Sequence, residues 1–333
     1  MPDQPTLAEV AAAAGVSPAT ASRVLTGSVR VRTSARVQVH AAMARLGYTP
    51  RGGGDRRQRR TVPVIAAVVC ESTRRLFTDS FFARLITGAE ESLARESVPL
   101  LVLPTSPTTL AATERFLVSG GVDGVLLISA HKQHPLAAAV SAAGVPVRCA
   151  GRPADDLPLP FVDADNRGGA RRAVEHLMRT GRRTIATIAG PPDLSAAVDR
   201  LEGYRDGLED SAMQAPPVAY GDFTQASGSH AMGWLLHRVP NLDAVFVASD
   251  LMAVGAIHTL RRAGRRVPED VAVIGFDDAP AARYVTPALT TVRQPVENLG
   301  AVASELLLGE VLDGRTGSHN PVLPTELVIR QSA

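Results

Sequence analysis

The chain has 333 residues, of which 45% are hydrophobic and 4% aromatic, and its formal net charge is +2. This length is too great for one ordinary domain and suits two or three, with cores built largely from Ala, Val and Leu. No apolar run reaches the roughly 18 residues of a membrane span, and the N-terminus lacks the pattern of a secretion signal. Cys70 and Cys149 have no metal-ligand spacing, so we expect a cytoplasmic protein with two reduced, buried thiols.

The charge is unevenly distributed along the chain. Residues 1–60 contain ten arginines against three acidic residues, a net charge of +7, which leaves −5 for the remainder. A basic N-terminal segment on a mildly acidic body is typical of a chain whose first segment binds a polyanion.

The first predicted helix begins at Thr6. Thr6 and Glu9 have the spacing of a capping box, in which each side chain accepts a hydrogen bond from the backbone of the other. Gly15 ends this helix because glycine tolerates a positive φ. Ser17 and Pro18 then begin a second helix, with Ser as the N-cap and Pro in the first helical position.

The second and third predicted helices complete a small all-α unit. The third runs from about Thr33 to Leu46. The residues expected to be buried are Ala21, Val24 and Leu25 in the second helix, and Val37, Ala41 and Met43 or Ala44 in the third. Two short helices joined by Gly-Val-Ser and closed by a third predict a helix-turn-helix. The charge of +7 favours DNA as its partner over the alternative, a small protein-binding unit.

The candidate DNA contacts lie on and around the second helix: Thr6, Ser17, Pro18, Ala19, Thr20, Ser22, Arg23, Thr26 and Arg30. Among the outward side chains of that helix, only Arg23 could make a bidentate contact to guanine, unless it is simply a solvated charge. We expect Arg30, Arg32 and Arg36 to hold phosphates, which position a protein on DNA without reading its sequence.

From Val62 onward, short apolar runs alternate with helical stretches. The predicted strands are Val64–Val69, Leu100–Leu103, Gly124–Ile128, Pro146–Cys149, Thr184–Ala189, Ala244–Val247 and Val271–Ile274. The predicted helices lie near 81–96, 109–119, 134–143, 166–180, 196–211, 225–237, 250–263 and 295–313. This alternation predicts parallel sheets with helices on both faces. The elements are too many for one sheet, so we expect two α/β lobes with a ligand cleft between them, beyond the carboxyl ends of the strands.

Candidate ligand-binding residues therefore follow strands: Phe81, Phe82, Arg200, Phe223, Ser249, Asp250 and Asp277. We expect one of the two adjacent phenylalanines to pack in the core and the other to face the cleft. Asp250 starts a predicted helix, so its position favours capping over ligand contact. Phe223 could stack on a sugar ring or belong to the core.

Runs of sequence over residues 6–330 resemble the LacI/GalR family of repressors. They include TLAEVAAAAGVSPATASRVLTG and AAMARLGYTP in the N-terminal unit, and RLEGYRDGL, DLMAVGAI, VAVIGFDD, TPALTTVRQPVENLG and PTELVIR in the body. The resemblance implies that Pro18, Ala19 and Arg23 read bases, and that Arg200 and Asp277 hold sugar hydroxyls in a sensor similar to periplasmic binding proteins. It also implies that Phe223 stacks on the ligand.

The resemblance further implies the organisation of the whole molecule. We expect a helix-turn-helix at 1–50, a linker at 51–62 and a sensor at 63–333. The chain should cross between the lobes near 162, 292 and 322. The N-lobe is then about 63–161 plus 293–321, and the C-lobe about 162–292 plus 322–333. Family members pair as homodimers, so two heads would bind a near-palindromic double-stranded operator.

The linker departs from the family pattern. In relatives it forms a short hinge helix whose leucine wedges into the minor groove, a position that falls here on Arg57. Residues 52–54 are three glycines, each of which disfavours a helix by about 1 kcal/mol relative to Ala. We expect either a flexible basic arm that enters a narrow minor groove through Arg57, or a tether whose charge has no role.

Two further departures concern the ligand. Relatives often carry Asn where this chain has Ser249, and Asp where it has Gly151, followed by Arg152. A carbohydrate effector remains the expectation. A sugar acid or sugar phosphate held by Arg152 is an alternative, as is a regulator that responds to a partner protein or to no ligand.

Other classes of protein fit less well. The sequence has no Walker loop, no nucleophile elbow and no metal spacing among its eight histidines, so we expect neither catalysis nor a cofactor. A transport-type binding protein would fit the body but not the basic helix-turn-helix. The sequence therefore predicts a DNA-binding transcriptional regulator, and the family resemblance implies a repressor.

Overall fold

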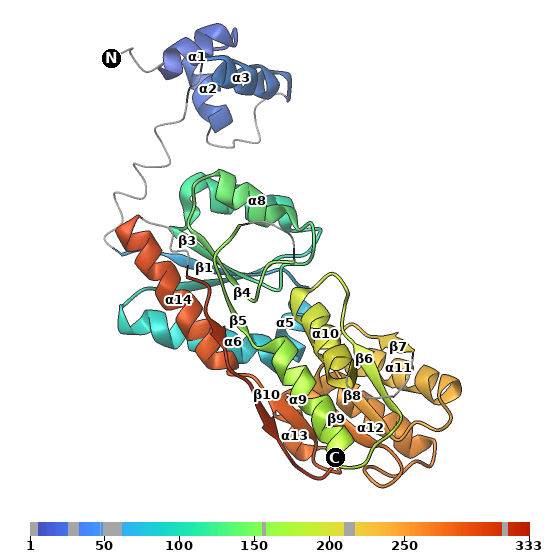
Figure 1. The fold of residues 1–333 in the computed structure, drawn as a ribbon. Helices are drawn as coiled ribbons and strands as arrows, with labels where there is room; N and C mark the ends of the chain where they lie inside the picture. The colour runs from blue at the N-terminus through green and yellow to red at the C-terminus, as the bar shows by residue number, and fades with distance from the viewer. Residues whose placement is uncertain are drawn as a thin grey trace.

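The computed structural model describes residues 6–25, 33–46, 48, 62–154, 158–209, 217–314 and 319–333. Thr26, Arg30 and Arg57, three of the candidate DNA contacts, lie outside these ranges. Figure 1 shows a helical N-terminal unit and two α/β lobes. In the described residues, no helix is long and apolar enough to cross a membrane.

The N-terminal unit consists of α1 (Leu7–Ala13), α2 (Pro18–Leu25) and α3 (Thr33–Leu46). The capping box of α1 is formed, with Glu9 N donating to Thr6 Oγ1 at 3.3 Å and Thr6 N donating to the Glu9 carboxylate at 2.6 Å. The buried core is Val10, Ala11, Ala14, Ala21, Val24, Val39 and Ala42.

The prediction for the buried side of α3 was wrong for Ala41 and is confirmed for Met43. Val39 and Ala42 are buried, and Met43 packs against them, whereas Ala41 is exposed. Positions 39, 42 and 43 are spaced three and four residues apart, so they share one face of the helix.

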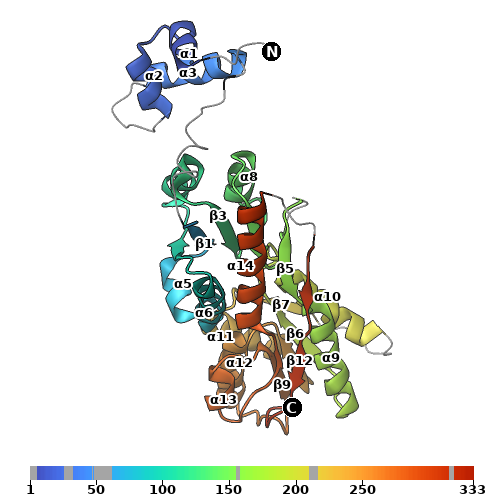
Figure 2. The same ribbon diagram turned by 90° about the vertical axis from the view of Figure 1, so that its left-hand side faces the viewer.

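The N-lobe contains a six-stranded parallel sheet in the order β11-β5-β4-β3-β1-β2. Its strands are β1 (Ile65–Val69), β2 (Leu100–Pro104), β3 (Gly124–Ile128), β4 (Val147–Ala150), β5 (Phe161–Ala164) and β11 (Val322–Leu323). Its helices are α5 (Thr73–Thr78), α6 (Ser80–Arg95), α7 (Leu110–Phe116), η1 (Leu117–Gly121), α8 (Pro135–Ala142) and α14 (Val296–Asp313). Side chains of α6 and α14 share one core with the sheet, and Figure 2 shows α14 upright along this lobe.

The C-lobe contains the second sheet, in the order β12-β10-β9-β8-β6-β7, which is parallel except for the β10–β12 pair. Its strands are β6 (Ile185–Ala189), β7 (Val218–Tyr220), β8 (Ala244–Val247), β9 (Ala272–Asp277), β10 (Thr290–Arg293) and β12 (Glu326–Val328). Its helices are α9 (Asn166–Arg179), α10 (Ser195–Glu209), α11 (Gln225–Arg238), α12 (Asp250–Arg262) and α13 (Ala281–Tyr284).

The chain crosses between the lobes three times. The crossings lie at Asp165, at Gln294–Pro295 and at Pro324–Thr325, between strands that belong to different sheets. Each crossing is two or three residues after its expected position. Val162–Ala164, expected in the C-lobe, therefore lies in the N-lobe sheet, because β5 pairs with β4 and β11 before the chain crosses.

Candidate effector cleft

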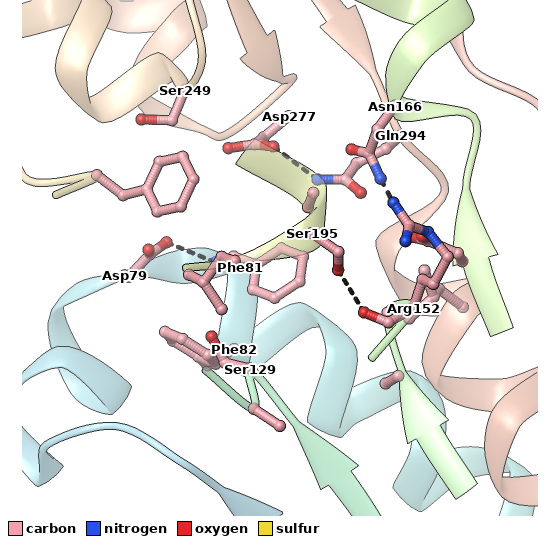
Figure 3. A pocket seen from close by; sticks show the side chains of 18 of the residues that line it. Asp79, Phe81, Phe82, Ser129, Arg152, Asn166, Ser195, Ser249, Asp277 and Gln294 are labelled. Carbon is pink, nitrogen blue, oxygen red and sulfur yellow. Dashed lines mark hydrogen bonds between the residues drawn. The ribbon is translucent and has the colours of Figure 1, made fainter. Parts of the chain in front are cut away.

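A cavity lies between the lobes, beyond the carboxyl ends of strands from both sheets. Its empty volume is about 1030 Å³, including space open to solvent. The C-lobe and hinge contribute Arg200, Phe223, Asp277 and Gln294, and the N-lobe contributes Asp79, Phe81, Phe82 and Arg152. Figure 3 shows the labelled side chains converging on this space. The position agrees with the general rule for ligand sites in open α/β sheets.

Arg200 is held rigidly on the C-lobe side of the cavity. Its Nε donates to Asn166 Oδ1 at 2.9 Å and its Nη1 to the Ala248 carbonyl at 2.6 Å. Nη1 also lies 3.2 Å from Asp277 Oδ1, and the guanidinium carbon lies 3.8 Å from the centre of the Phe276 ring. A guanidinium fixed on several sides can present its remaining donors to a ligand without losing side-chain entropy.

Asp277 ends β9 with a φ of 115°, a conformation that side-chain-bearing residues rarely adopt. Gln294 Nε2 donates to its Oδ1 at 2.6 Å, while Oδ2 has no hydrogen-bond partner among the described residues. Burial raises the pKa of Asp277 to about 6, against the opposing effect of Arg200. The strained backbone thus holds a desolvated acceptor against the cavity.

Three phenylalanines form apolar walls. Phe82 is fully buried and Phe81 half-buried, with their rings edge to face at 5.4 Å, and both contact the cavity. Phe223 comes from the opposite lobe with a φ of 67°, and Arg75 and Arg200 lie 5.5 and 5.9 Å from its ring centre. Aromatic faces on one side of the cavity and planar polar groups on the other suit a ligand ring that has apolar faces and polar edges.

Asp79 lines the cavity and was not among the predicted residues. It is the N-cap of α6, where its Oδ1 accepts from Phe81 N at 3.0 Å. Its Oδ2 has no hydrogen-bond partner among the described residues, and burial raises its pKa. An Asp two residues before an aromatic pair at a helix start was the available signal.

Asn166 and Gln294 were also missed as individual residues. Each lies within three residues of a crossing between the lobes, and each binds one of the two charged groups above. Gln294 belongs to a run quoted for the family resemblance, so its position in the sequence was known but its role was not.

Ser249 and Asp250 have different positions. Ser249 lines the cavity and is the N-cap of α12, with its Oγ accepting from Met252 N at 3.3 Å. Asp250 is fully buried behind the wall, where it accepts from Thr291 Oγ1 and Ala279 N, both at 2.6 Å. The geometry therefore contradicts a ligand contact for Asp250, since both of its oxygens are used to join β10 and the segment after β9 to α12.

Arg152 lines the cavity but is already paired. Its Nη2 donates to Asp199 Oδ1 at 2.6 Å. The other three arginines on the wall are paired as well: Arg75 with Glu71, Arg84 with Glu297 and Arg200 with Asp277. The positive charges on the cavity wall are therefore balanced within the protein.

The candidate DNA contacts that the structure describes gather at the start of α2. Thr20 N donates to Ser17 Oγ at 3.1 Å, and the Ser17 and Thr20 hydroxyls lie 2.8 Å apart. Pro18, Ala19, Ser22 and Arg23 are exposed, whereas Thr20 is half-buried. Thr6 is exposed at the N-cap of α1. An exposed helix start that follows a tight turn is the part of a helix-turn-helix that enters the major groove.

A helix-turn-helix followed by two α/β lobes around a ligand-sized cavity defines a sensor-coupled, DNA-binding transcriptional regulator. Residues 6–51 match the model of bacterial regulatory proteins of the lacI family, and residues 174–333 match that of a periplasmic binding protein-like domain. The chain belongs to the LacI family of transcriptional regulators and is not an enzyme.

Two curated relatives match almost the whole chain. The transcriptional regulator CelR of Thermobifida fusca is 42% identical, over 99% of this chain and 98% of its own length. The transcriptional repressor CytR of Escherichia coli strain K12 is 33% identical, over 98% of this chain and 96% of its own length.

Solved structures resemble the fold over the same extent. A complex of the transcriptional regulator CelR with cellobiose has a TM-score of 0.81 and 41% identity, and covers 99% of this chain and 100% of that one. The lac repressor dimer bound to operator and an anti-inducer has a TM-score of 0.72 and 28% identity, and covers 99% of each chain.

Proposed function

We propose that this protein is a homodimeric operator-binding regulator, acting in the cytoplasm, whose affinity for DNA is set by an uncharged carbohydrate bound between the lobes. Residues 1–50 bind DNA, residues 51–62 link the DNA-binding unit to the sensor, and residues 63–333 bind the ligand. The cavity carries this proposal, because it opposes aromatic walls to fixed hydrogen-bonding groups from both lobes. The similarity to the CelR–cellobiose complex makes cellobiose the first candidate effector.

The charges on the wall favour a neutral ligand over a sugar acid or phosphate. An anion at Arg152 would have to displace Asp199, and at Arg200 it would have to compete with Asp277. Burial also raises the pKa of Asp79, and raises that of Asp163 and Asp277 to about 6. Buried carboxylates accept hydrogen bonds from sugar hydroxyls readily, and they repel anions.

An exposed apolar edge of the N-lobe supports the homodimer. Leu101 and Val102, on the edge strand β2, are each 38% exposed. An apolar edge strand left open is prone to aggregate, so natural proteins cover it. A second copy of this chain would cover it and would place two heads on a twofold axis, facing a near-palindromic operator.

The test separates sugar binding from DNA binding. The full chain is titrated with a selected operator duplex, then with cellobiose, and with cellobionic acid as the charged analogue. At a hundred times its dissociation constant, cellobiose should stabilise the fold by about 2.7 kcal/mol. It should also change operator affinity, with release indicating an inducer and tightening indicating a co-repressor, while the acid should bind at least tenfold more weakly.

Two variants assign the sites. Arg23→Ala should bind operator and random DNA alike and keep the response to cellobiose. Arg200→Lys keeps a charge beside Asp277 but loses the guanidinium fork, so it should bind operator normally and lose the response to sugar. Intact operator binding with no stabilisation by either sugar would contradict a carbohydrate effector. That outcome would point to a partner protein or to regulation without a ligand.

A further inference from the structure

One segment of the C-lobe is clasped by the N-lobe at the rim of the cavity. The segment, residues 193–199, ends the loop after β6 and forms the first turn of α10. Lys132 N, in the loop after β3, donates to the Asp193 carbonyl at 2.8 Å. Beside it, His131 Nδ1 lies 2.8 Å from Asp193 Oδ2. The same C-lobe residue is thus held through both its backbone and its side chain.

The loop after β4 makes the second half of the clasp. Arg152 Nη2 donates to Asp199 Oδ1 at 2.6 Å, and the Ser195 hydroxyl donates to the Arg152 carbonyl (Figure 3). We call this set of contacts between residues 131, 132 and 152 and the segment 193–199 the rim latch. Since all its contacts join different lobes, opening about the three crossings would break them.

His131 lies between two carboxylates that belong to different lobes. Its Nε2 is 3.1 Å from Glu71 Oε1, in the loop after β1 of its own lobe, while Asp193 approaches from the C-lobe. The other charged or titratable groups near it are Lys132, His134 at the start of α8, and Arg75 of α5, which is paired with Glu71. Glu71 therefore stays beside His131 in any arrangement of the lobes, whereas Asp193 is added only when they close.

We propose that the rim latch is a proton-sensitive switch, in which protonation of His131 favours the closed lobes and so tightens effector binding as the pH falls. The coupling to the effector rests on the proposed function, whereas the effect of protons on closure does not. An imidazolium satisfies both carboxylates as a donor on each nitrogen, whereas the neutral ring can donate to only one of them.

The direction follows from linkage. The hydrogen bond to Glu71 raises the pKa of His131 in either arrangement of the lobes and burial lowers it, whereas the hydrogen bond and the charge of Asp193 raise the pKa further only in the closed form. A pKa raised on closing means that closing takes up a proton. The contribution of His131 to closure is thus complete below the open-state pKa and is lost as the pH rises through the closed-state pKa.

Hydrogen exchange at the Lys132 amide measures the latch directly, because that N–H is bonded across the lobes to Asp193. The amide of Asp123, bonded within the N-lobe to the Val64 carbonyl, is the internal reference. Exchange of the full chain is followed from below to above pH 6.5, without ligand and with cellobiose, and corrected for intrinsic rates. For one proton, protection of Lys132 should fall by up to about tenfold per pH unit through the transition, while Asp123 stays constant.

Variants separate His131 from the acids of the cavity that titrate near pH 6. In His131→Gln and in Asp193→Asn the pH dependence of Lys132 protection should disappear, whereas His230→Gln, an exposed site on α11, should retain it. Wild-type protection that does not change with pH, or an unchanged dependence in both latch variants, overturns the switch. A pH-dependent latch that cellobiose does not tighten leaves the switch standing and contradicts cellobiose as the effector.

Discussion

Asp277 combines two unfavourable properties for a folded protein, a desolvated carboxyl group and a positive φ. Burial raises its pKa from 3.8 to about 6, although Arg200 lies 3.2 Å away. The folded state therefore holds the acid proton more tightly than the unfolded chain, and the free energy of unfolding should fall as the pH rises from about 3.8 to about 6. A costly group at a cavity wall points to selection for binding and not for stability.

We expect Asp277→Asn to keep the shape and the positive φ, which Asn tolerates better than most residues. Above pH 6 the free energy of unfolding of the variant should equal that of wild type or exceed it by up to about 1–3 kcal/mol, because the substitution removes a disfavoured charge. Its affinity for cellobiose should fall about ten- to hundredfold, through loss of a charged acceptor. Urea unfolding measures the stability of the variant, and titration calorimetry measures its affinity for cellobiose. A variant markedly less stable than wild type above pH 6 would show that the attraction of Asp277 to Arg200 outweighs the cost of its burial.

The residues that could be predicted are those whose place after a strand already implies the cleft. Arg200, Phe223 and Asp277 belong to this group, and each lines the cavity. Asn166 and Gln294 could not be assigned roles, since their partners are distant in sequence and meet them only at the crossings. Asp250 shows the converse error, because a residue after a strand can point behind the wall as well as into it.

At the scale of elements, long buried strands were predicted and short edge strands were not. The strands β1, β3 and β8 are continuous apolar runs and β6 is interrupted only by Thr187, and none of the four has an exposed position. The missed strands are β5 and β10, interior strands of four residues, and β7, β11 and β12, each of two or three residues at the edge of its sheet and without an alternating pattern. Pairing with a formed neighbour, and not intrinsic preference, determines such strands.

The contact between α6 and α14 requires glycines. A Cβ at Gly300 of α14 would lie 2.1 Å from the Leu85 carbonyl, and one at Gly88 of α6 would lie 1.8 Å from the Glu297 carbonyl. Because the helices approach this closely, α14 is fixed on the N-lobe even though it begins at a crossing. Arg84 of α6 then binds both Glu297 and the Asp277 carbonyl, which connects this helix pair to the cavity.

Gly300→Ala and Gly309→Ala form a matched pair on α14. The first forces two backbones apart and should cost about 1–3 kcal/mol of unfolding free energy. At Gly309 the added Cβ meets no atom within 4 Å, so the gain in helix propensity should stabilise the protein by about 0.5–1 kcal/mol. The denaturant midpoint of each variant, compared with that of wild type, shows whether the substitution stabilises or destabilises the protein. Equal effects would show that helix propensity, and not the contact with α6, governs both sites.

At the scale of the whole molecule, the two edges of the N-lobe sheet differ in what they offer. The β2 edge carries the exposed apolar residues Leu101 and Val102, while the opposite edge, β11, carries Val322, which is 58% exposed. In the proposed dimer only the β2 edge is covered. In that dimer, sugar binding in each cleft can change the affinity for DNA only by changing how the two covered edges position the two DNA-binding units.

We expect Leu101→Asp to yield a folded monomer and Val322→Asp to remain a dimer, as sedimentation equilibrium would show. A monomer loses the effective concentration that one bound head gives the other, so operator affinity should fall at least about a hundredfold. It also contacts about half as many phosphates, and the slope of log affinity against log salt should fall by about half. A weaker affinity with an unchanged slope would mean that Leu101 affects the fold and not the dimer, and a monomeric Val322→Asp would place the dimer contact on the other edge.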